Sequence, residues 1–444
     1  MQICRIHFFT LFFSLFAGFL NAPAAAQITA ITHARLIDGT GSAAADDRTI
    51  LIEGRVIKAV GGPDLMPPSG ARVIDAKGKT AMPGLADMHV HLVGGWDGVS
   101  LDLLGYQNYM NSLLYSGVTT VLDTGNIPPY VLQLRQAVAS GLVQGPRIYC
   151  VGPLLDGADP VWGPLGVAIS SKYQIPSVVE QLKTENVDLV KLYVGLSDQV
   201  VRAISTEAKN KNLRTIIDQW QRNGSMDLMD EGIAGFAHLP SHRISEDAVR
   251  KAKEKGIFFI STLAVYEVFA RRRLRDLSFL NEPLIADVTP ASQLKGLREF
   301  AEKPIPPERQ QESRQRLTDF EDAEKNVKPL WHSGVLIATG TDAPYPGDFQ
   351  GEGVHHEMGL LVESGLTPLQ AIAAATKNAA SIMNADKEWG TLEPGKIANI
   401  LLIDGKPDQN IRETRRITLV MKHGEVIDRD KLKFGSQSKD FPAL

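Results

Sequence analysis

The chain has 444 residues, of which 43% are hydrophobic and 22% are charged, and its formal net charge is −4 at pH 7. These values exclude a disordered or fibrous chain, and the near-balance of charge gives no electrostatic reason to expect nucleic acid as a partner. The only two cysteines, Cys4 and Cys150, exclude a disulfide framework.

The first 26 residues have the features of a secretory signal peptide. Arg5 precedes a largely apolar run at residues 8–20, and small residues then lead to Ala26, where we expect cleavage. The run is shorter than the ~20 residues that a membrane-spanning helix needs. We therefore expect an exported protein, periplasmic or secreted, with no stable membrane anchor after cleavage.

Two segments, residues 27–82 and 388–435, contain short apolar runs separated by Gly, Pro and Asp residues. This pattern is typical of strands joined by turns. Because the two segments flank the rest of the chain, we expect one small β-sandwich domain built from both ends of the mature protein.

The segment between them, residues 83–387, alternates short apolar runs with stretches of helical length. Eight such runs predict an α/β fold, a (β/α)8 or TIM barrel. The eight runs are Leu85–His91, Val118–Asp123, Arg147–Val151, Val187–Tyr193, Leu213–Asp218, Gly235–His238, Phe258–Leu263 and Val335–Asp342.

A wide gap between the seventh and eighth runs predicts a helical insertion at about residues 265–330. It contains the basic cluster Arg271–Arg275. Two interpretations of this cluster remain open. It belongs to a solvated helical insertion, or it lies in a lid over the barrel mouth where its arginines contact an acidic group of the substrate.

A His-x-His pair, His89 and His91, lies on the first predicted barrel strand. Side chains two apart on a strand project from the same face, so both imidazoles are suited to bind one metal ion. The surrounding segment Pro83–Leu92 resembles the first metal-binding motif of the amidohydrolase superfamily. Three further segments resemble that superfamily as well, and the nearest branch contains imidazolonepropionase-related and prolidase-related members. These segments are Ser116–Asp123, Gly340–Asp342 and Gly390–Asn399.

The resemblance implies a metal-dependent hydrolase that cleaves a C–N bond in an amide, dipeptide or cyclic amide with a metal-activated water. It implies that His89, His91 and Asp342 hold the first metal, that Asp342 also transfers protons, and that His238 is a further ligand and catalytic residue. Lys191 matches the lysine that binuclear relatives carry in carboxylated form between two metals. Burial beside metals favours the neutral amine that carboxylation requires.

The chain departs from the family pattern on the fifth strand, where Asp218 stands in place of a metal-binding His. Either Asp218 binds the metal, or the second metal is weak or absent. We expect one or two divalent ions per chain, with zinc first and Mn or Fe as alternatives because a carboxylate is a harder ligand.

Candidate substrate-binding residues are Tyr193, His242 and His356. The segment His355–Glu357 does not complete a His-Glu-x-x-His motif, because residue 360 is Leu. The expected partner is a small-molecule substrate, and a homo-oligomer remains open. Two alternative functions also remain: a mononuclear cyclic-amide hydrolase or deaminase with unmodified Lys191, and an inactive barrel that acts as a binding protein.

Overall fold

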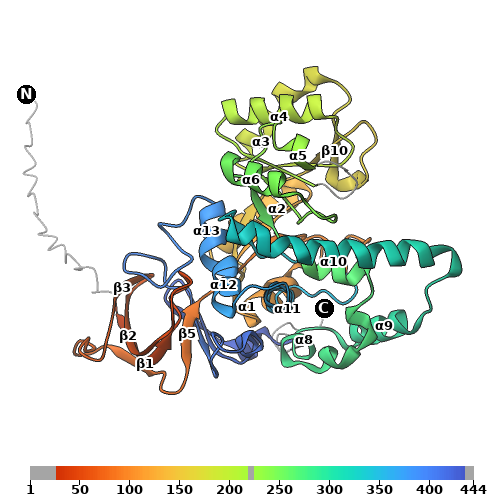
Figure 1. The fold of residues 1–444 in the computed structure, drawn as a ribbon. Helices are drawn as coiled ribbons and strands as arrows, with labels where there is room; N and C mark the ends of the chain where they lie inside the picture. Colours follow the sequence, from red (N-terminus) through yellow and green to blue (C-terminus); the bar gives the residue numbers. More distant parts are fainter. Residues whose placement is uncertain (1–26, 219–224, 436–444) are drawn as a thin grey trace, which may run out of the picture.

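The computed structural model describes residues 27–218 and 225–435 (Figure 1). The predicted signal peptide, residues 1–26, lies outside the described residues. Within the described ranges, no helix combines the length and the apolar character that crossing a bilayer demands.

Eight parallel strands close into the predicted (β/α)8 barrel. Hydrogen-bonded pairs run from the first strand to the third and from the fourth to the eighth. Single backbone hydrogen bonds join the strands at the two remaining places. Asp188 N donates to Cys150 O at 2.9 Å between the third and fourth strands, and Met88 N donates to Thr339 O at 2.9 Å between the first and eighth. The strands are β6 (Leu85–Val90), β7 (Val118–Asp123), β8 (Arg147–Cys150), β11 (Val190–Leu192), β12 (Thr215–Ile217), β13 (Gly235–Phe236), β14 (Phe258–Ile260) and β15 (Ile337–Ala338). Two short strands, β9 (Leu154–Asp156) and β10 (Gly166–Ala168), extend the sheet beside β11.

The barrel helices form where apolar residues recur with helical spacing. In α4 (Asp198–Asn210) the buried residues Val201, Ile204 and Ala208 lie on one face, which packs into the main apolar core. α6 (Glu246–Lys255) begins after a capping Ser245 and ends at a left-handed glycine. The other helices of the barrel are α1 (Tyr106–Tyr115), α2 (Pro128–Ala139), α3 (Ile175–Thr184), α5 (Ser225–Leu228), α11 (Glu352–Glu363), α12 (Pro368–Ala373) and α13 (Ala379–Ile382).

Strands from both ends of the chain form one eight-stranded sheet beside the barrel, at the lower left of Figure 1. The two parts join where β5 (Thr80–Pro83) pairs antiparallel with β16 (Ile400–Ile403). Apolar side chains from both parts share one core. The remaining strands are β1 (Ile28–Leu36), β2 (Ala45–Glu53), β3 (Val56–Gly61), β4 (Arg72–Asp75), β17 (Ile417–Lys422) and β18 (Glu425–Ile427).

The segment between β14 and β15 is helical. It contains α7 (Leu263–Phe269), α8 (Pro283–Ala286), α9 (Ala291–Glu302) and α10 (Gln310–His332). The long helix α10 crosses the barrel at the right of Figure 1.

The basic cluster in this insertion binds protein groups. Arg273 is buried and donates to both carboxylate oxygens of Glu352, at 2.7 and 2.9 Å. Arg272 donates to Glu363 at 3.2 Å, and Arg271 donates to the carbonyl oxygen of Phe300 at 3.1 Å. Of the two interpretations left open, substrate contact is therefore not supported for these three arginines, because their guanidinium groups bind α9 of the insertion itself and α11 of the barrel.

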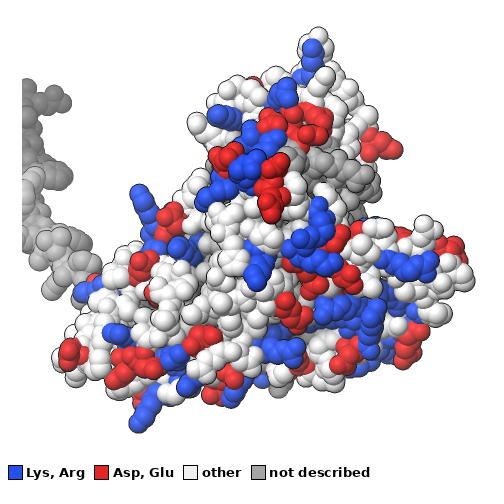
Figure 2. Space-filling model, viewed as in Figure 1, with Lys and Arg blue, Asp and Glu red and all other residues white. Residues whose placement is uncertain are grey.

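Charged residues of both signs lie interspersed over the face drawn in Figure 2. Lys and Arg side chains alternate there with Asp and Glu side chains across the barrel and the β domain. This distribution agrees with the small net charge of the chain.

Candidate active site

His89 and His91 lie at the carboxyl end of β6, and the backbone fixes the orientation of both rings. His89 Nδ1 lies 2.8 Å from Ala237 O, and His91 Nδ1 lies 3.0 Å from Gly125 O. Each Nε2 therefore points to Asp342, at 3.4 Å from His89 and 3.1 Å from His91. A backbone carbonyl on one ring nitrogen is the usual way to present the other nitrogen to a metal.

Asp342 follows β15 with a left-handed backbone, at φ 69°. Its N–H donates to His89 O at 2.7 Å. A non-glycine residue in this region is strained and is characteristic of functional sites. The turn places the carboxylate directly against the two histidines of the neighbouring strand.

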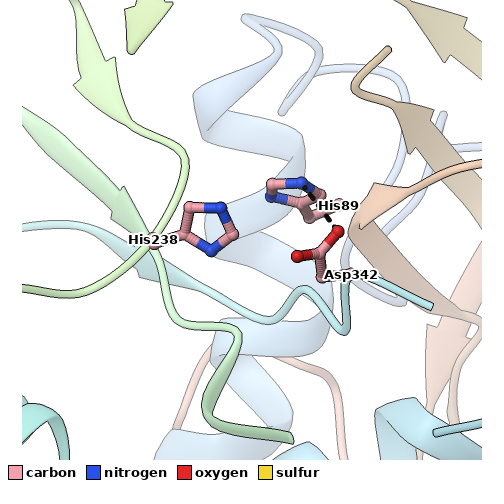
Figure 3. A group of neighbouring side chains, drawn as sticks. All are labelled: His89, His238 and Asp342. Carbon is pink, nitrogen blue, oxygen red and sulfur yellow. Dashed lines mark ion pairs between the residues drawn. The ribbon is translucent and has the colours of Figure 1, made fainter. Parts of the chain in front are cut away.

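His238 completes a compact group on the opposite side. Its Nδ1 lies 2.7 Å from Thr262 Oγ1, and its ring centroid lies 4.6 Å from that of His89. Ligand atoms of His89, His238 and Asp342 all lie within 4.8 Å of one another. Figure 3 shows the three side chains grouped around one point. Two imidazoles and a carboxylate at this separation fit a divalent ion such as zinc.

Lys191 and Asp218 extend the inner face of the barrel. Leu189 and Ile216, two positions earlier in the chain, lie in an apolar cluster with residues of the other barrel strands. The two polar side chains are buried, with Lys191 Nζ 3.6 Å from Asp218 Oδ2. Asp218 Oδ2 also lies 2.9 Å from His238 Nε2. The aspartate that departs from the family pattern is therefore inside the site, between the lysine and the histidine.

Several ionisable groups of the site have shifted pKa values, because they lie close together and away from water. Burial, followed by the charge of Lys191, lowers the pKa of His89 well below its ordinary value. Burial also lowers the pKa of Lys191, against the opposing charges of Asp218 and Asp342. For His91 burial is outweighed by Asp342, which raises the pKa. Strongly perturbed groups of this kind concentrate at functional sites.

A cavity of about 210 Å³ opens above this cluster. His89, His91, Lys191, Asp218 and Asp342 lie in its wall, with Tyr193 beside them. Trp162 Nε1 donates to the hydroxyl oxygen of Tyr193 at 2.8 Å. Since an indole N–H can only donate, the Tyr193 hydroxyl retains its own proton to donate to a ligand in the cavity.

Two other predicted substrate-binding residues lie outside the cavity wall. The carbonyl oxygen of His242 accepts a hydrogen bond from Asn326 at 2.8 Å, which ties this segment to α10. The ring of His356 contacts the carboxylate of Glu267, between α11 and α7. Neither residue is in the cavity wall, and a substrate-binding role for His242 and His356 stays a prediction.

Sequence reasoning did not identify several residues of the cavity wall. Tyr345 follows Asp342 closely in the sequence, and this was the only indication that it could belong to the site. The others come from loops and from the insertion, where no motif marks them. They include Val99, Leu101, Val161, Trp162, Leu165, Phe269 and Arg316.

Gly340 permits the close approach of β15 to β6. A β-carbon at this position would lie 2.7 Å from His89 Cβ, 3.0 Å from His89 N and 2.4 Å from Ile260 Cγ2. We expect Gly340→Ala to separate Asp342 from His89 and to weaken metal binding about 10–100-fold, the cost of disturbing the support of a ligand. Titration with a buffered metal and a competing chelator measures this affinity. Gly359→Ala is the control, because a β-carbon there meets no atom within 4 Å; equal affinities of the two variants would contradict the prediction.

Comparison with known proteins agrees with this geometry. An imidazolonepropionase of Geobacillus kaustophilus is 26% identical over 379 residues, which cover 81% of this chain and 84% of that protein. An enamidase of Eubacterium barkeri is 42% identical over 82 residues, so that the match spans only 18% of this chain and 20% of the enamidase. The solved structure of an Xaa-Pro dipeptidase with bound methionine has a TM-score of 0.73 at 20% identity, covering 90% of this chain and all of that one.

The Amidohydrolase family matches residues 80–427, which include every strand of the barrel and every residue of the cluster described above. The structural neighbours share the barrel fold. The chain therefore belongs to the amidohydrolase family and is a hydrolase that acts on carbon–nitrogen bonds.

Proposed function

We propose that the protein is an exported, metal-dependent amidohydrolase that cleaves an amide, dipeptide or cyclic amide bond. The observation that carries the proposal is the convergence of His89, His238 and Asp342 within 4.8 Å, with His89 and Asp342 in the wall of a cavity. The similar proteins support the proposed range of amide, dipeptide and cyclic amide substrates, since they include an imidazolonepropionase and an Xaa-Pro dipeptidase. Export rests on the sequence of residues 1–26 alone.

His89, His91 and Asp342 would hold the first ion, with His238 beside them. A divalent ion there supplies Lewis acidity, which polarises a carbonyl group and makes water more acidic. Asp342 accepts the proton of the attacking water and passes it to the leaving nitrogen, a task suited to a carboxylate held between two imidazoles. His238, whose ring contacts Thr262 and Asp218, would act as a further ligand beside the first ion.

Lys191 and Asp218 would hold a second ion. The buried position of Lys191 lowers its pKa and favours the neutral amine that takes up carbon dioxide. A carboxylated Lys191 would be an anion beside the carboxylate of Asp218, and the two groups would serve as ligands for a second cation, whose charge would offset their repulsion. We propose zinc as the metal, with Mn or Fe as alternatives.

A mononuclear site is the second candidate, and the 3.6 Å contact of Lys191 with Asp218 favours it. In that arrangement the unmodified lysine and the aspartate neutralise each other. The protein then holds one ion and acts on a cyclic amide or as a deaminase.

Metal analysis tests both forms of the proposal. We expect roughly two ions per chain, the number that a binuclear hydrolase holds, together with a carbamate on Lys191 in the mass spectrum of the native protein. Chelation is expected to abolish hydrolysis of a library of dipeptides, N-acyl amino acids and lactams, and added zinc is expected to restore it. Roughly one ion with an unmodified lysine indicates the mononuclear form. Full turnover by the metal-free protein would contradict metal dependence.

A further inference from the structure

Large apolar side chains are exposed to solvent at the mouth of the cavity, on two different loops. Val99 and Leu101, between β6 and α1, line the cavity, and Val99 is 74% exposed. Val161, between β9 and β10, also lines it and is 60% exposed. We call these three residues the apolar rim. Leu103 and Leu104 continue the first loop outside the cavity wall, and Leu104 is 89% exposed. Exposed apolar side chains gathered at one place mark a surface that binds an apolar partner.

Hydrogen bonds fix the backbone of the apolar rim. The carboxylate of Asp97 accepts the backbone N–H groups of Val99 at 3.0 Å and of Ser100 at 2.8 Å. On the other loop the buried carboxylate of Asp156 accepts the N–H of Val161 at 2.9 Å. Both loops therefore hold the rim side chains in place before any ligand arrives, which lowers the entropic cost of binding one.

The apolar surface continues from the rim into the cavity. Leu154 and Leu165 belong to one apolar cluster, against which Trp162 and Tyr193 pack. All four residues lie in the cavity wall, together with the cluster around Asp342. The rim is therefore continuous with the place where the scissile bond would lie, and this continuity points to the substrate itself as the apolar partner.

One charged side chain of the described wall, Arg316, lies outside the cluster around Asp342. Its charge is balanced within its own helix, since it pairs with Glu312 at 3.7 Å and with Asp319 at 3.9 Å. Its guanidinium also lies over the ring of Phe269, with 5.7 Å to the ring centroid. Apolar contact is therefore the interaction that most of the described wall offers to a substrate.

We propose that the substrate is an amide with a large apolar substituent, which lies along Trp162 and Leu165 and reaches the apolar rim. This inference rests on the proposed function and narrows its substrate class. Binding removes the apolar surface of the substituent and of the rim from water, and this is favourable in proportion to the area buried. In the reaction water adds to the carbonyl carbon, the C–N bond breaks, and the nitrogen takes a proton.

Two series of neutral amides test the proposal on the zinc-loaded enzyme. In the first, the acyl chain of a methylamide grows from acetyl through butanoyl and hexanoyl to octanoyl. In the second, the acyl group stays acetyl and the N-alkyl chain grows over the same lengths. We expect kcat/KM to rise about two- to fourfold for each added methylene group in at least one series, because each group leaves water. For an amide that binds without being cleaved, the inhibition constant against an accepted library substrate gives the same dependence.

Replacement of the rim valines tests where the chain lies. The double variant Val99→Ser and Val161→Ser is expected to reduce the gain from the four-carbon to the eight-carbon chain by about threefold or more. It should raise KM for the longer substrate more than it lowers kcat. Leu142→Ser is the matched control, because Leu142 is 83% exposed and lies outside the cavity wall. It should retain the wild-type dependence on chain length.

Flat chain-length profiles in both series would overturn this inference and leave the proposed function standing. A profile that the double variant leaves unchanged would overturn it too. Flat profiles together with a dimer that Leu104→Ser dissociates would assign the exposed side chains to a second copy of the chain instead. Absence of turnover with both series and with the whole library would overturn the inference and the proposed function together.

Discussion

Replacement of Asp342 with Asn is expected to lower kcat about 10²–10⁴-fold, the range that general acid–base catalysis contributes. The carboxylate lies 3.1 Å from His91 Nε2 and 3.4 Å from His89 Nε2. It is therefore next to the proposed metal ligands, where it would take a proton from the attacking water. An amide has the same shape but accepts no proton from water. Steady-state kinetics on an accepted substrate measures the loss.

The loss of activity must be separated from loss of metal or of fold. Metal content is therefore measured on the same sample, because Asn also replaces a proposed ligand. Asp404→Asn is the control, since Asp404 is exposed in the β domain, where it pairs with Arg416. A kcat of Asp342→Asn within about threefold of wild type would refute the assigned role. Loss of a proton-transfer group is expected to lower kcat by about a hundredfold at least.

Replacement of Glu352 with Gln is expected to lower the free energy of unfolding by about 3–5 kcal/mol, the cost of leaving a buried charge without its partner. Glu352 is fully buried and accepts hydrogen bonds from Arg273 at 2.7 Å and from Arg415 at 3.0 Å. The variant leaves two guanidinium groups without the anion between them. Urea denaturation of the metal-loaded protein measures the change.

The same carboxylate makes stability depend on pH. Burial raises the pKa of Glu352, but the charges of Arg273 and Arg415 outweigh it and hold the pKa at about 2, below the ordinary value of 4.5. Its contribution is therefore fully present above about pH 4.5 and is lost as the pH falls toward 2. We expect Glu352→Gln to flatten this acid limb of the stability curve. Glu363→Gln, an exposed partner of Arg272, is the control and should cost at most about 1 kcal/mol.

The parts of the site that the sequence predicted are those that strand ends bring together. Parallel strands in a closed barrel all end at the same rim, so His89, Lys191, Asp218, His238 and Asp342 meet although up to 253 positions separate them. Lys191 and Asp218 were assigned from the resemblance to the family, and the structure buries both beside His238. That Asp218 contacts His238 was not predicted from the sequence.

The parts that the sequence did not predict depend on which partner a side chain finds. The basic cluster at residues 271–275 and Arg316 have the same chemistry, yet Arg273 binds a buried glutamate and Arg316 lines the cavity. Neither charge nor helical spacing distinguishes them, because the fold of the insertion decides which face meets α11 and which meets the barrel mouth. His356 was assigned to the substrate for its neighbourhood in sequence, but consecutive residues of a helix point in different directions.

The pairing of β5 with β16 also determines the order in which the protein can fold. β5 is made early and its partner is made after the entire barrel, so during synthesis the N-terminal strands present an unpaired sheet edge. Contacts so distant along the chain close slowly, because a long loop must be ordered before they form. Completion of this sheet therefore waits for the C-terminal strands, and until they are made the edge of β5 that pairs with β16 has no partner strand.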